Sequence, residues 1–597
     1  MTVLSRFFAG VAAVTMALTP VVHAQRPMEK LGRGVVAVRA SEEEVLVSWR
    51  LLGLDPEGIA FNIYRSTGGS EPEKLNSEVL SGGTNFLDSN NVAEDSAYFV
   101  RTVIDGEEGE ESGSFILPGG NAVEPLFRIP LENSGPIRFA WVGDLDGDGE
   151  YEYVVDRTNS VQSIEAYYQN GTRLWTVDLG PLSENQNNIE PGATAISLGN
   201  WDGVTVYDFD SDGRAEVALR VANGVTFGDG QVFEHDNDDE QFIGFLDGQT
   251  GALRAQAEIP TDYIEHGPLA GRLGVGYLDG TTPHLVTFLK NRRDDKAFNL
   301  IYAAYTFDGS AATQAWMWKR EDQPFADGHN GRILDADGDG IDEVHEIGFT
   351  LNGDGTLKFS LDGDGIVHGD RFYISKIDPS RDGLQGYGIQ QDNPNKLTDY
   401  YYDASTGEVL WKHEGTEVVD VGRGLIGDID PSSPGMEVWS FQGIYDPVDN
   451  EVLGDPAQHP WPAMTLFWDG DELPELLNDG KVEKWDYENP SDSSDVPRLF
   501  RAQDFGGVTA AQHNPAFIGD ILGDWREEFI VTNEDSTELL VFSTNIPTDI
   551  RLYTLAHNPQ YRNDMTLKGY MQSHNTDYFI GRDMEMPPQP NIVYVGE

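Results

Sequence analysis

The stretch Asp144-Leu-Asp-Gly-Asp-Gly-Glu-Tyr-Glu152 runs directly into a short apolar segment, 153–155, and it recurs along the chain. Asp208-Phe-Asp-Ser-Asp-Gly-Arg-Ala-Glu216 and Asp335-Ala-Asp-Gly-Asp-Gly-Ile-Asp-Glu343 have the same spacing, and weaker copies begin at Asp378, Asp428 and Asp520. Repeated units of about 40 to 50 residues with turns between strands are typical of β-propeller blades. Larger gaps between copies would hold blades with insertions or blades without the motif. We therefore predict an all-β chain in which residues 121–597 form an eight-bladed β-propeller.

The acidic loops have the ligand spacing of a calcium site. Carboxylates at positions 1, 3 and 5 with glycine at position 6 place hard oxygen ligands on one side of a tight turn, which suits Ca²⁺. The closing Glu stands at position 9, whereas an EF-hand closes at position 12, and strands flank these loops. The alternative is a solvated acidic turn without an ion. The predicted Ca²⁺ ligands are Asp144, Asp146, Asp148, Glu152, Asp208, Asp210, Asp212, Glu216, Asp335, Asp337, Asp339 and Glu343, with Asp428 and Asp520 from the weaker copies.

Residues 25–120 read as a separate all-β module. Val45, Val47 and Trp49 alternate with polar residues, and segment 96–104 is another apolar run. This alternation is typical of strands with one buried face, and several such strands predict a small β-sandwich. Gly119-Gly120-Asn121 would then be the hinge to the propeller.

Residues 1–24 resemble an export signal. Arg6 precedes an apolar run, 7–20, that is too short to span a bilayer, and small residues follow at Val22 and Ala24. The mature protein is therefore expected to be secreted or periplasmic and not a membrane protein. A buried N-terminal helix is the alternative interpretation.

Composition narrows the possible partners. The chain has 597 residues, 40 Lys and Arg against 101 Asp and Glu, a net charge of −61, and no cysteine. Nucleic-acid binding needs dense basic residues, so no nucleic-acid partner is expected. Disulfides, thiolate metal sites and a thiol nucleophile are excluded. The acidity suggests saline surroundings, in which salt screens self-repulsion, and a monomer is expected.

Several further motifs carry a family resemblance. They include Arg26-Pro-Met-Glu-Lys-Leu-Gly-Arg-Gly34, the segments GDLDGDGEYE (143–152) and VHGDRFY (367–373), DVGRGLIGDID (420–430) and RLYTLAHNPQYR (551–562). With the acidic loops they resemble family 11 polysaccharide lyases, the rhamnogalacturonan lyases, in order over nearly the whole mature chain. The resemblance implies an eight-bladed β-propeller with bound Ca²⁺. It also implies β-elimination at uronic acids of a rhamnose–uronate polysaccharide, so an acidic polysaccharide is the expected substrate.

The resemblance also implies site residues. His329 in an HN pair, His368 and Asp370 in an HGD segment, and Arg423 in a GRG segment match the family pattern, and Tyr570 resembles a C-terminal tyrosine of the family. The four residues other than Asp370 are catalytic candidates, and Asp370 is a metal-ligand candidate. The alternatives are histidines that only brace a blade and a buried Arg423–Asp ion pair.

Departures from the family pattern fall in the expected substrate pocket. Gln512 stands where the family has a lysine that is a catalytic candidate, and the neighbouring His513 could act as a base in its place. The remaining substrate-binding candidates are Arg138, Asn200, Lys290, Arg292, Arg293 and His574. The basic cluster at 290–293 could recognise carboxylate or sulfate, or it could be a surface turn paired with Asp294 and Asp295.

A lyase must neutralise the C6 carboxylate, remove the C5 proton and assist departure of O4. Ca²⁺ with Arg423 is the predicted neutraliser, and His513 or Tyr570 the base or acid. Two alternatives concern the substrate and the role: an ulvan lyase acting on a sulfated algal rhamnose–uronate polymer, and a non-catalytic calcium-dependent glycan-binding propeller. A hydrolase with a carboxylate pair is the third alternative.

Overall fold

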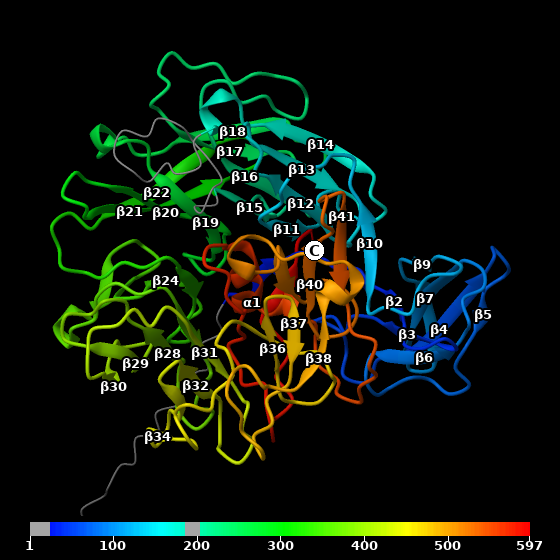
Figure 1. Ribbon diagram of the computed structural model, residues 1–597. Coiled ribbons are helices and arrows are strands. Elements are labelled where there is room, and N and C mark those ends of the chain that lie inside the picture. The colour runs from blue at the N-terminus through cyan, green and yellow to red at the C-terminus, as the bar shows by residue number, and fades with distance from the viewer. Residues whose placement is uncertain (1–23, 185–202, 597) are drawn as a thin grey trace, which may run out of the picture.

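Figure 1 shows a computed structural model of the chain, which describes residues 24–184 and 203–596. Strands dominate these residues, and they contain a single α-helix, α1 (Pro559–Thr566). The predicted all-β class is therefore confirmed. The predicted signal segment, apart from Ala24, and the substrate candidate Asn200 lie outside the described residues.

Eight antiparallel four-stranded sheets follow one another in the described part of the large region. Seven of them are built from strands that are consecutive in sequence. These are β11 (Ala140–Gly143), β12 (Glu152–Arg157), β13 (Ser163–Tyr167) and β14 (Arg173–Asp178); β15 (Val204–Tyr207), β16 (Glu216–Val221), β17 (Phe242–Leu246) and β18 (Leu253–Glu258); β19 (Ala270–Gly276), β20 (His284–Arg292), β21 (Phe298–Phe307) and β22 (Ala312–Lys319); β23 (Arg332–Leu334), β24 (Glu343–Glu346), β25 (Phe349–Leu351) and β26 (Leu357–Ser360); β27 (Phe372–Ser375), β28 (Gln385–Ile389), β29 (Leu397–Asp403) and β30 (Val409–Glu414); β31 (Gly424–Gly427), β32 (Glu437–Ser440), β33 (Gly443–Asp446) and β34 (Glu451–Val452); and β35 (Thr465–Leu466), β36 (Glu475–Asn478), β37 (Lys481–Glu483) and β38 (Arg498–Arg501).

The eighth sheet joins distant parts of the sequence. Its order is β10-β41-β40-β39, where β10 (Leu126–Pro130) comes from the start of the large region and β39 (Phe517–Gly519), β40 (Glu528–Thr532) and β41 (Glu538–Phe542) from near its end. Neighbouring sheets contact one another through their first strands, as β11 does with β15 and β31 with β35. Figure 1 shows the sheets arranged around α1.

The N-terminal strands form two antiparallel sheets that pack on each other. One has the order β2 (Val36–Arg39), β3 (Glu44–Ser48), β6 (Asn85–Ser89). The other has the order β5 (Glu73–Lys74), β4 (Ala60–Thr67), β7 (Ser96–Ile104), β8 (Glu107–Glu111), with β9 (Phe115–Leu117) also on β7. Trp49, Phe61 and Tyr98 are in the buried core of this module. In contrast, β1 (Arg26–Met28) leaves the module and pairs in parallel with the C-terminal strand β42 (Ile592–Tyr594).

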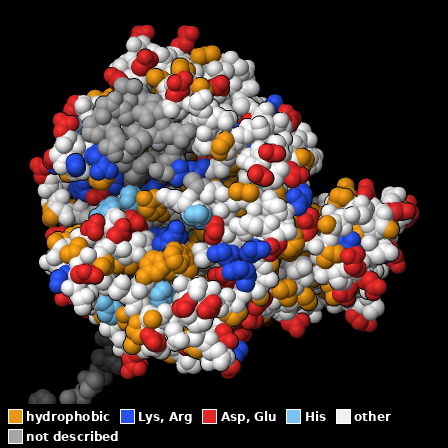
Figure 2. Space-filling view, in the orientation of Figure 1, with side chains coloured by type: hydrophobic (Ala, Val, Ile, Leu, Met, Phe, Trp, Pro, Cys, Tyr) orange, Lys and Arg blue, Asp and Glu red, His pale blue; other side chains and the backbone are white. Residues whose placement is uncertain are grey.

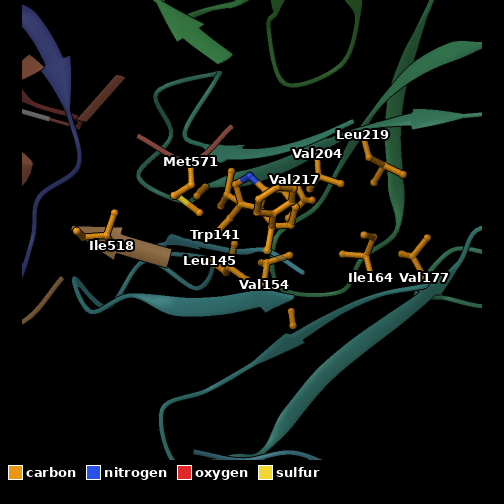
Figure 3. Close-up of a cluster of buried hydrophobic side chains, with 14 of the residues drawn as sticks. Trp141, Leu145, Val154, Ile164, Val177, Val204, Val217, Leu219, Ile518 and Met571 are labelled. Atoms are coloured by element: carbon orange, nitrogen blue, oxygen red, sulfur yellow. The ribbon is translucent and has the colours of Figure 1, made fainter. Parts of the chain in front are cut away.

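A hydrophobic core lies between neighbouring sheets of the large region. Trp141 and Val154 from the β11–β14 sheet meet Val204 and Val217 from the next sheet, as Figure 3 shows, and all four are essentially buried. Burial of each such side chain stabilises the fold by roughly 1.5–3 kcal/mol. The alternating apolar residues of these short strands therefore have a neighbouring sheet to pack against on each side.

The C-terminal segment around α1 fills the space between the sheets. Asn558 caps the helix by accepting a hydrogen bond from the Tyr561 backbone, and α1 contacts β15, β19 and β23. Gln560 donates to the Ile374 carbonyl oxygen of β27, and Thr465 of β35 donates its backbone N–H to Ser573 Oγ. This segment is buried and polar, so it ties several sheets together by hydrogen bonds.

A buried ion pair links this segment to the N-terminus. Arg562 and Glu29 are almost fully buried and their charged atoms lie 2.5 Å apart. We expect Arg562→Met to lower the free energy of unfolding by about 3–5 kcal/mol, because Glu29 would be left as an unpaired buried charge. Urea unfolding would measure this change. The control Arg501→Met breaks an exposed pair with Asp504 and should leave the free energy of unfolding nearly unchanged; an equal cost for both variants would contradict the interpretation.

Candidate active site

The residues carried over from the family resemblance lie at one end of the first strands. His329 precedes β23, His368 and Asp370 precede β27, and Arg423 directly precedes β31. The acidic loops follow the first strands, as Asp335 follows β23. The histidines and the acidic loops are therefore at opposite ends of the same strands.

Two glycines bring the histidine loops into contact. Gly328 and Gly369 form a parallel bridge between the two loops. A Cβ on Gly328 would lie only 2.5 Å from the Gly369 carbonyl oxygen, so this approach requires glycine. Asn330 fixes the loops further by donating from Nδ2 to the Asp370 carbonyl oxygen at 2.9 Å.

The loop contact places three ligand-type side chains together. His329 Nε2 lies 3.1 Å from His368 Nε2 and 3.4 Å from Asp370 Oδ1. His368 Nδ1 lies 2.5 Å from the Asp327 carbonyl oxygen, which can only accept, so the proton is on Nδ1 and a neutral ring keeps its Nε2 lone pair for the cluster. Burial, with Lys290 and Arg272 nearby, lowers the pKa of His329 to about 2; burial and Lys290 also lower the pKa of His368.

This cluster can hold a divalent metal ion. One atom from each of His329, His368 and Asp370 lies within 4.8 Å of the others. Asp370 Oδ1 is buried and makes no hydrogen bond within the described part of the chain. A cation would satisfy these converging lone pairs. Two imidazoles with one carboxylate also suit a first-row transition metal, because Ca²⁺ prefers an all-oxygen shell.

Lys290 helps to hold the histidine cluster in place through Asp327. Its ammonium is fully buried and lies 2.6 Å from Asp327 Oδ2, while Arg320 holds Asp327 Oδ1 at 2.6 Å. Asp327 in turn accepts from His368 through its backbone carbonyl. Lys290, predicted as a substrate-binding residue, is in strand β20 and positions a histidine loop in this structure.

We therefore expect Lys290→Met to weaken divalent-metal binding at the cluster by about 10–100-fold, as changes in groups that orient metal ligands do. Metal titration of the chelated protein, followed by calorimetry, measures the affinity. The control is Arg293→Met, since Arg293 is partly exposed and pairs with Asp295 at 2.9 Å. A Lys290 variant that binds metal normally but has a raised KM would instead show that Lys290 binds the substrate.

Tyr570 and Arg423 border the same cluster. The Tyr570 ring stacks on His329 with 4.5 Å between centroids, and within the described residues its hydroxyl makes no hydrogen bond to the protein. Burial and Asp370 raise the pKa of Tyr570, against the opposing charges of Arg272 and Arg138.

The Arg423 guanidinium is half-buried, and no ion pair or hydrogen bond of its side chain is found among the described residues. Burial and the neighbouring Arg371 lower its pKa to about 10, whereas Asp370 raises it. The predicted alternative of a buried ion pair is therefore not what the geometry shows. A guanidinium without a carboxylate partner can receive the carboxylate of a ligand.

The basic residues offset the acidity of the chain locally. Figure 2 shows Lys, Arg and His side chains gathered around the middle of the viewed face, with Asp and Glu spread over its outer parts. Arg138, Arg272, Arg371 and Arg423 all act on the charges of this cluster. An acidic polymer can therefore meet positive charge here despite the net charge of −61.

The other predicted substrate-binding residues lie in different parts of the structure. Arg138 interacts electrostatically with Tyr570, whereas Arg292 lies over the Phe298 ring, 4.4 Å from its centroid. His574 is buried between Phe517 and Tyr561, and burial lowers its pKa strongly.

Gln512 and His513 are exposed in a 3-10 turn (Ala511–His513). His513 Nδ1 lies 3.0 Å from Asp479, and the side chain is 77% exposed. The described contacts of His513 do not include the His329 cluster. Its catalytic role stays a prediction.

Most predicted calcium ligands fall in clusters that could hold a metal ion. Within the described residues these clusters are Asp144–Asp146–Glu152, Asp208–Asp210–Glu216 and Asp335–Asp337–Asp339. Asp148, Asp212 and Glu343 adjoin them without meeting the same distance limit, and Asp428 and Asp520 are in no such cluster. Asp520 Oδ2 instead accepts from Thr554 and the Leu555 backbone, which gives it a structural role.

Sequence reasoning missed several groups. Arg272, Arg371 and Asp420 all act on the charge of Asp370, and none was singled out. Arg371 directly follows the HGD segment, and Arg272 is a lone base in an apolar strand, which were the available signals. A further acidic cluster, Asp469–Asp471–Glu475, was also missed, because Phe467 stands where the repeat has its first Asp.

Comparison with known proteins gives matches over almost the whole chain. The model of "Rhamnogalacturonan lyase family 11, C-terminal domain" matches residues 137–248 and 268–590. That of "Rhamnogalacturonan I lyases beta-sheet domain" matches residues 26–116.

Two relatives from Bacillus subtilis (strain 168) match nearly the full length of the chain. Rhamnogalacturonan endolyase YesW is 32% identical over 95% of this chain and 94% of its own length. Rhamnogalacturonan exolyase YesX is 32% identical over 96% of this chain and 98% of its own.

Solved structures agree with the sequence matches. The crystal structure of rhamnogalacturonan lyase YesW has a TM-score of 0.83 at 31% identity and covers 96% of this chain and 100% of its own. The Bacillus licheniformis rhamnogalacturonan lyase PL11 has the same TM-score and coverages at 30% identity. The chain belongs to rhamnogalacturonan lyase family 11.

Proposed function

We propose that this protein is a polysaccharide lyase that cleaves rhamnose–uronic acid linkages of rhamnogalacturonan by β-elimination. The observation that carries the proposal is the meeting of His329, His368 and Asp370 with Arg423 and Tyr570, at positions that match the family motifs. Family membership, with matches over most of the described chain, supports the same reaction.

The chemistry follows from the charges at the site. A divalent cation bound by the His–His–Asp cluster would withdraw charge from the C6 carboxylate of the uronate and so acidify the C5 proton. Arg423 is placed to bind the same carboxylate, because its guanidinium has no carboxylate partner in the described chain. Both effects stabilise the enolate charge that develops as C5 loses its proton.

Tyr570 and His513 are the candidates for the acid and the base. The contacts favour Tyr570, whose ring stacks on His329. Its raised pKa keeps the hydroxyl protonated at neutral pH, which suits a donor to the departing O4 atom. The base assignment stays with His513 as a proposal.

The function test is product analysis with rhamnogalacturonan. β-Elimination should produce an unsaturated uronate that absorbs in the ultraviolet, with one new chain end for each double bond. Reducing ends without this absorbance would mean hydrolysis, and an intact polymer would mean binding only. Chelation should suppress the absorbance and a divalent cation should restore it.

Ulvan belongs in the same test as a second polymer, although no specific observation favours it. Both curated relatives are named for rhamnogalacturonan. In the basic cluster that suggested sulfate recognition, Lys290 pairs with Asp327 and Arg293 with Asp295. We expect ulvan to be cleaved more slowly than rhamnogalacturonan.

Three further proposals accompany this function, and they concern the fold, the bound ion and export. The eight sheets would be the blades of a closed propeller spanning residues 121–597, with the 25–120 module at its side; the pairing of β10 with β41 supports closure. Ca²⁺ is the proposed ion wherever an acidic loop holds one. Residues 1–24 would direct export. N-terminal sequencing of the secreted protein would test this, because the mature chain should then begin at Gln25. No helix among the described residues is long and apolar enough to cross a membrane.

A further inference from the structure

The acidic loops have similar sequences, but they differ in the basic side chains that contact their carboxylates. In loop 208–216, Arg254 lies 3.0 Å from Asp210 and 2.6 Å from Glu216. In loop 335–343, Lys358 lies 2.6 Å from Asp337 and 2.7 Å from Glu343. In both loops a side-chain cation therefore contacts the carboxylates at positions 3 and 9.

The loop that sequence reasoning missed has the same arrangement. Lys484 lies 3.1 Å from Asp469, 2.8 Å from Asp471 and 2.6 Å from Glu475. Glu475 accepts from the Trp468 backbone, just as Glu152 accepts from the Leu145 backbone. This makes Asp469 and Asp471 the counterparts of positions 3 and 5 in the repeat.

Loop 144–152 has no such cation. Asp144, Asp146 and Glu152 have ligand atoms within 4.8 Å of one another, and no Lys or Arg pairs with any of the three among the described ion pairs. The Tyr168 hydroxyl lies 3.2 Å from Asp146, and Arg50 lies 3.4 Å from Glu150, which is not one of the three. Three nearby carboxylates thus face one another without a positive charge between them.

Among the three repeat loops, the fourth strand of the sheet explains the difference. A register shift in β18 leaves Arg254 as the extra residue between Leu253 and Ala255, and a shift in β26 leaves Lys358 in the equivalent place. The same shift in β14 falls between Arg173 and Trp175, so Leu174 holds this position. One bulge residue is therefore a base in two sheets and an aliphatic side chain in a third. In the sheet of loop 469–475 the extra residue of β38 is Leu499, and the base, Lys484, directly follows β37 instead.

We propose that Arg254, Lys358 and Lys484 replace a divalent cation in their loops, and that loop 144–152 alone of these four keeps a divalent-cation site. An ammonium or guanidinium hydrogen-bonded to carboxylates at positions 3 and 9 supplies the charge that Ca²⁺ would supply, and its own charge repels a further cation. Binding of a metal ion and the presence of a base between positions 3 and 9 are thus alternatives. Ca²⁺ in all three repeat loops, as the sequence alone predicts, does not fit these contacts.

The test exchanges the bulge residues in the full-length protein and counts bound Ca²⁺. Each variant is stripped with a chelator and re-equilibrated with CaCl₂, and the bound Ca²⁺ per chain is measured together with the rise in Tm that Ca²⁺ causes. Leu174→Lys should lose one Ca²⁺ relative to the matched control Leu174→Met. Lys358→Met and Arg254→Met should each gain one Ca²⁺.

Two results would overturn the proposal. One is the same Ca²⁺ count in Leu174→Lys and Leu174→Met. The other is no gain in either Lys358→Met or Arg254→Met. If the variants do not fold, the anomalous signal from wild-type crystals grown with CaCl₂ decides: an ion in loop 144–152 with none in loops 208–216, 335–343 and 469–475 supports the proposal, and ions in those three loops refute it. Neither measurement depends on the polysaccharide, so this proposal can fail while the lyase function stands.

Discussion

Tyr570→Phe is expected to lower kcat on rhamnogalacturonan by about 10²–10⁴-fold, the range found when a general acid or base is removed. The substitution removes only the hydroxyl, which makes no hydrogen bond to the described protein, so the ring can keep its stacking on His329. Tm should therefore stay close to that of the wild type. Initial rates of ultraviolet absorbance at saturating substrate give kcat.

A matched control separates this effect from any general loss of a tyrosine hydroxyl. Tyr64→Phe removes a hydroxyl that bonds Glu108 on the surface of the N-terminal module, and it should leave kcat unchanged. The variant His513→Ala, measured in parallel, tests the other candidate. A Tyr570→Phe enzyme with wild-type kcat would remove Tyr570 from the proton transfer.

Arg423→Ala is expected to lower kcat/KM by about 10²–10³-fold, equivalent to about 2.7–4 kcal/mol, because it removes a donor aimed at the charge of the uronate. Arg423→Lys should recover part of the loss, since an ammonium keeps the charge but not the planar fork.

The control for charge removal is Arg501→Ala, which breaks an exposed pair with Asp504. It should change kcat/KM by less than about twofold, because an exposed ion pair contributes little to stability. Equal losses in the two variants would indicate a general effect of net charge. An unchanged Arg423→Ala enzyme would mean that another group binds the carboxylate.

The sequence predicted the strand-rich class because the repeat is local. In each repeat, the Asp residues, the glycine and the apolar residues that follow the Glu lie within a dozen positions, and the same spacing recurs in loops 144–152, 208–216 and 335–343. The site was reached through motif resemblance, which located His329, His368 and Arg423. The meeting of the two histidines depends on a backbone bridge between Gly328 and Gly369, which residue spacing could not show.

Contacts between residues that are far apart in the sequence could not be predicted from the sequence alone. Lys290 reads as part of a basic surface turn, yet strand β20 continues to Arg292, and Lys290 is buried against Asp327. Arg254 meets Glu216 from another strand of its sheet, so a loop that resembles a calcium site carries its own cation. Such pairings follow from strand register and bulges, which depend on packing between strands rather than on local sequence.

The most direct test of the account is a crystal structure of the Tyr570→Phe variant with a rhamnogalacturonan oligosaccharide and a divalent cation. We predict the cation on His329, His368 and Asp370, and a uronate carboxylate within hydrogen-bond distance of Arg423. A cavity of about 500 Å³ beside Asp335, Lys376 and Pro590 offers the oligosaccharide a different place. Sugar bound there, or a cluster that holds neither metal nor carboxylate, would contradict the account.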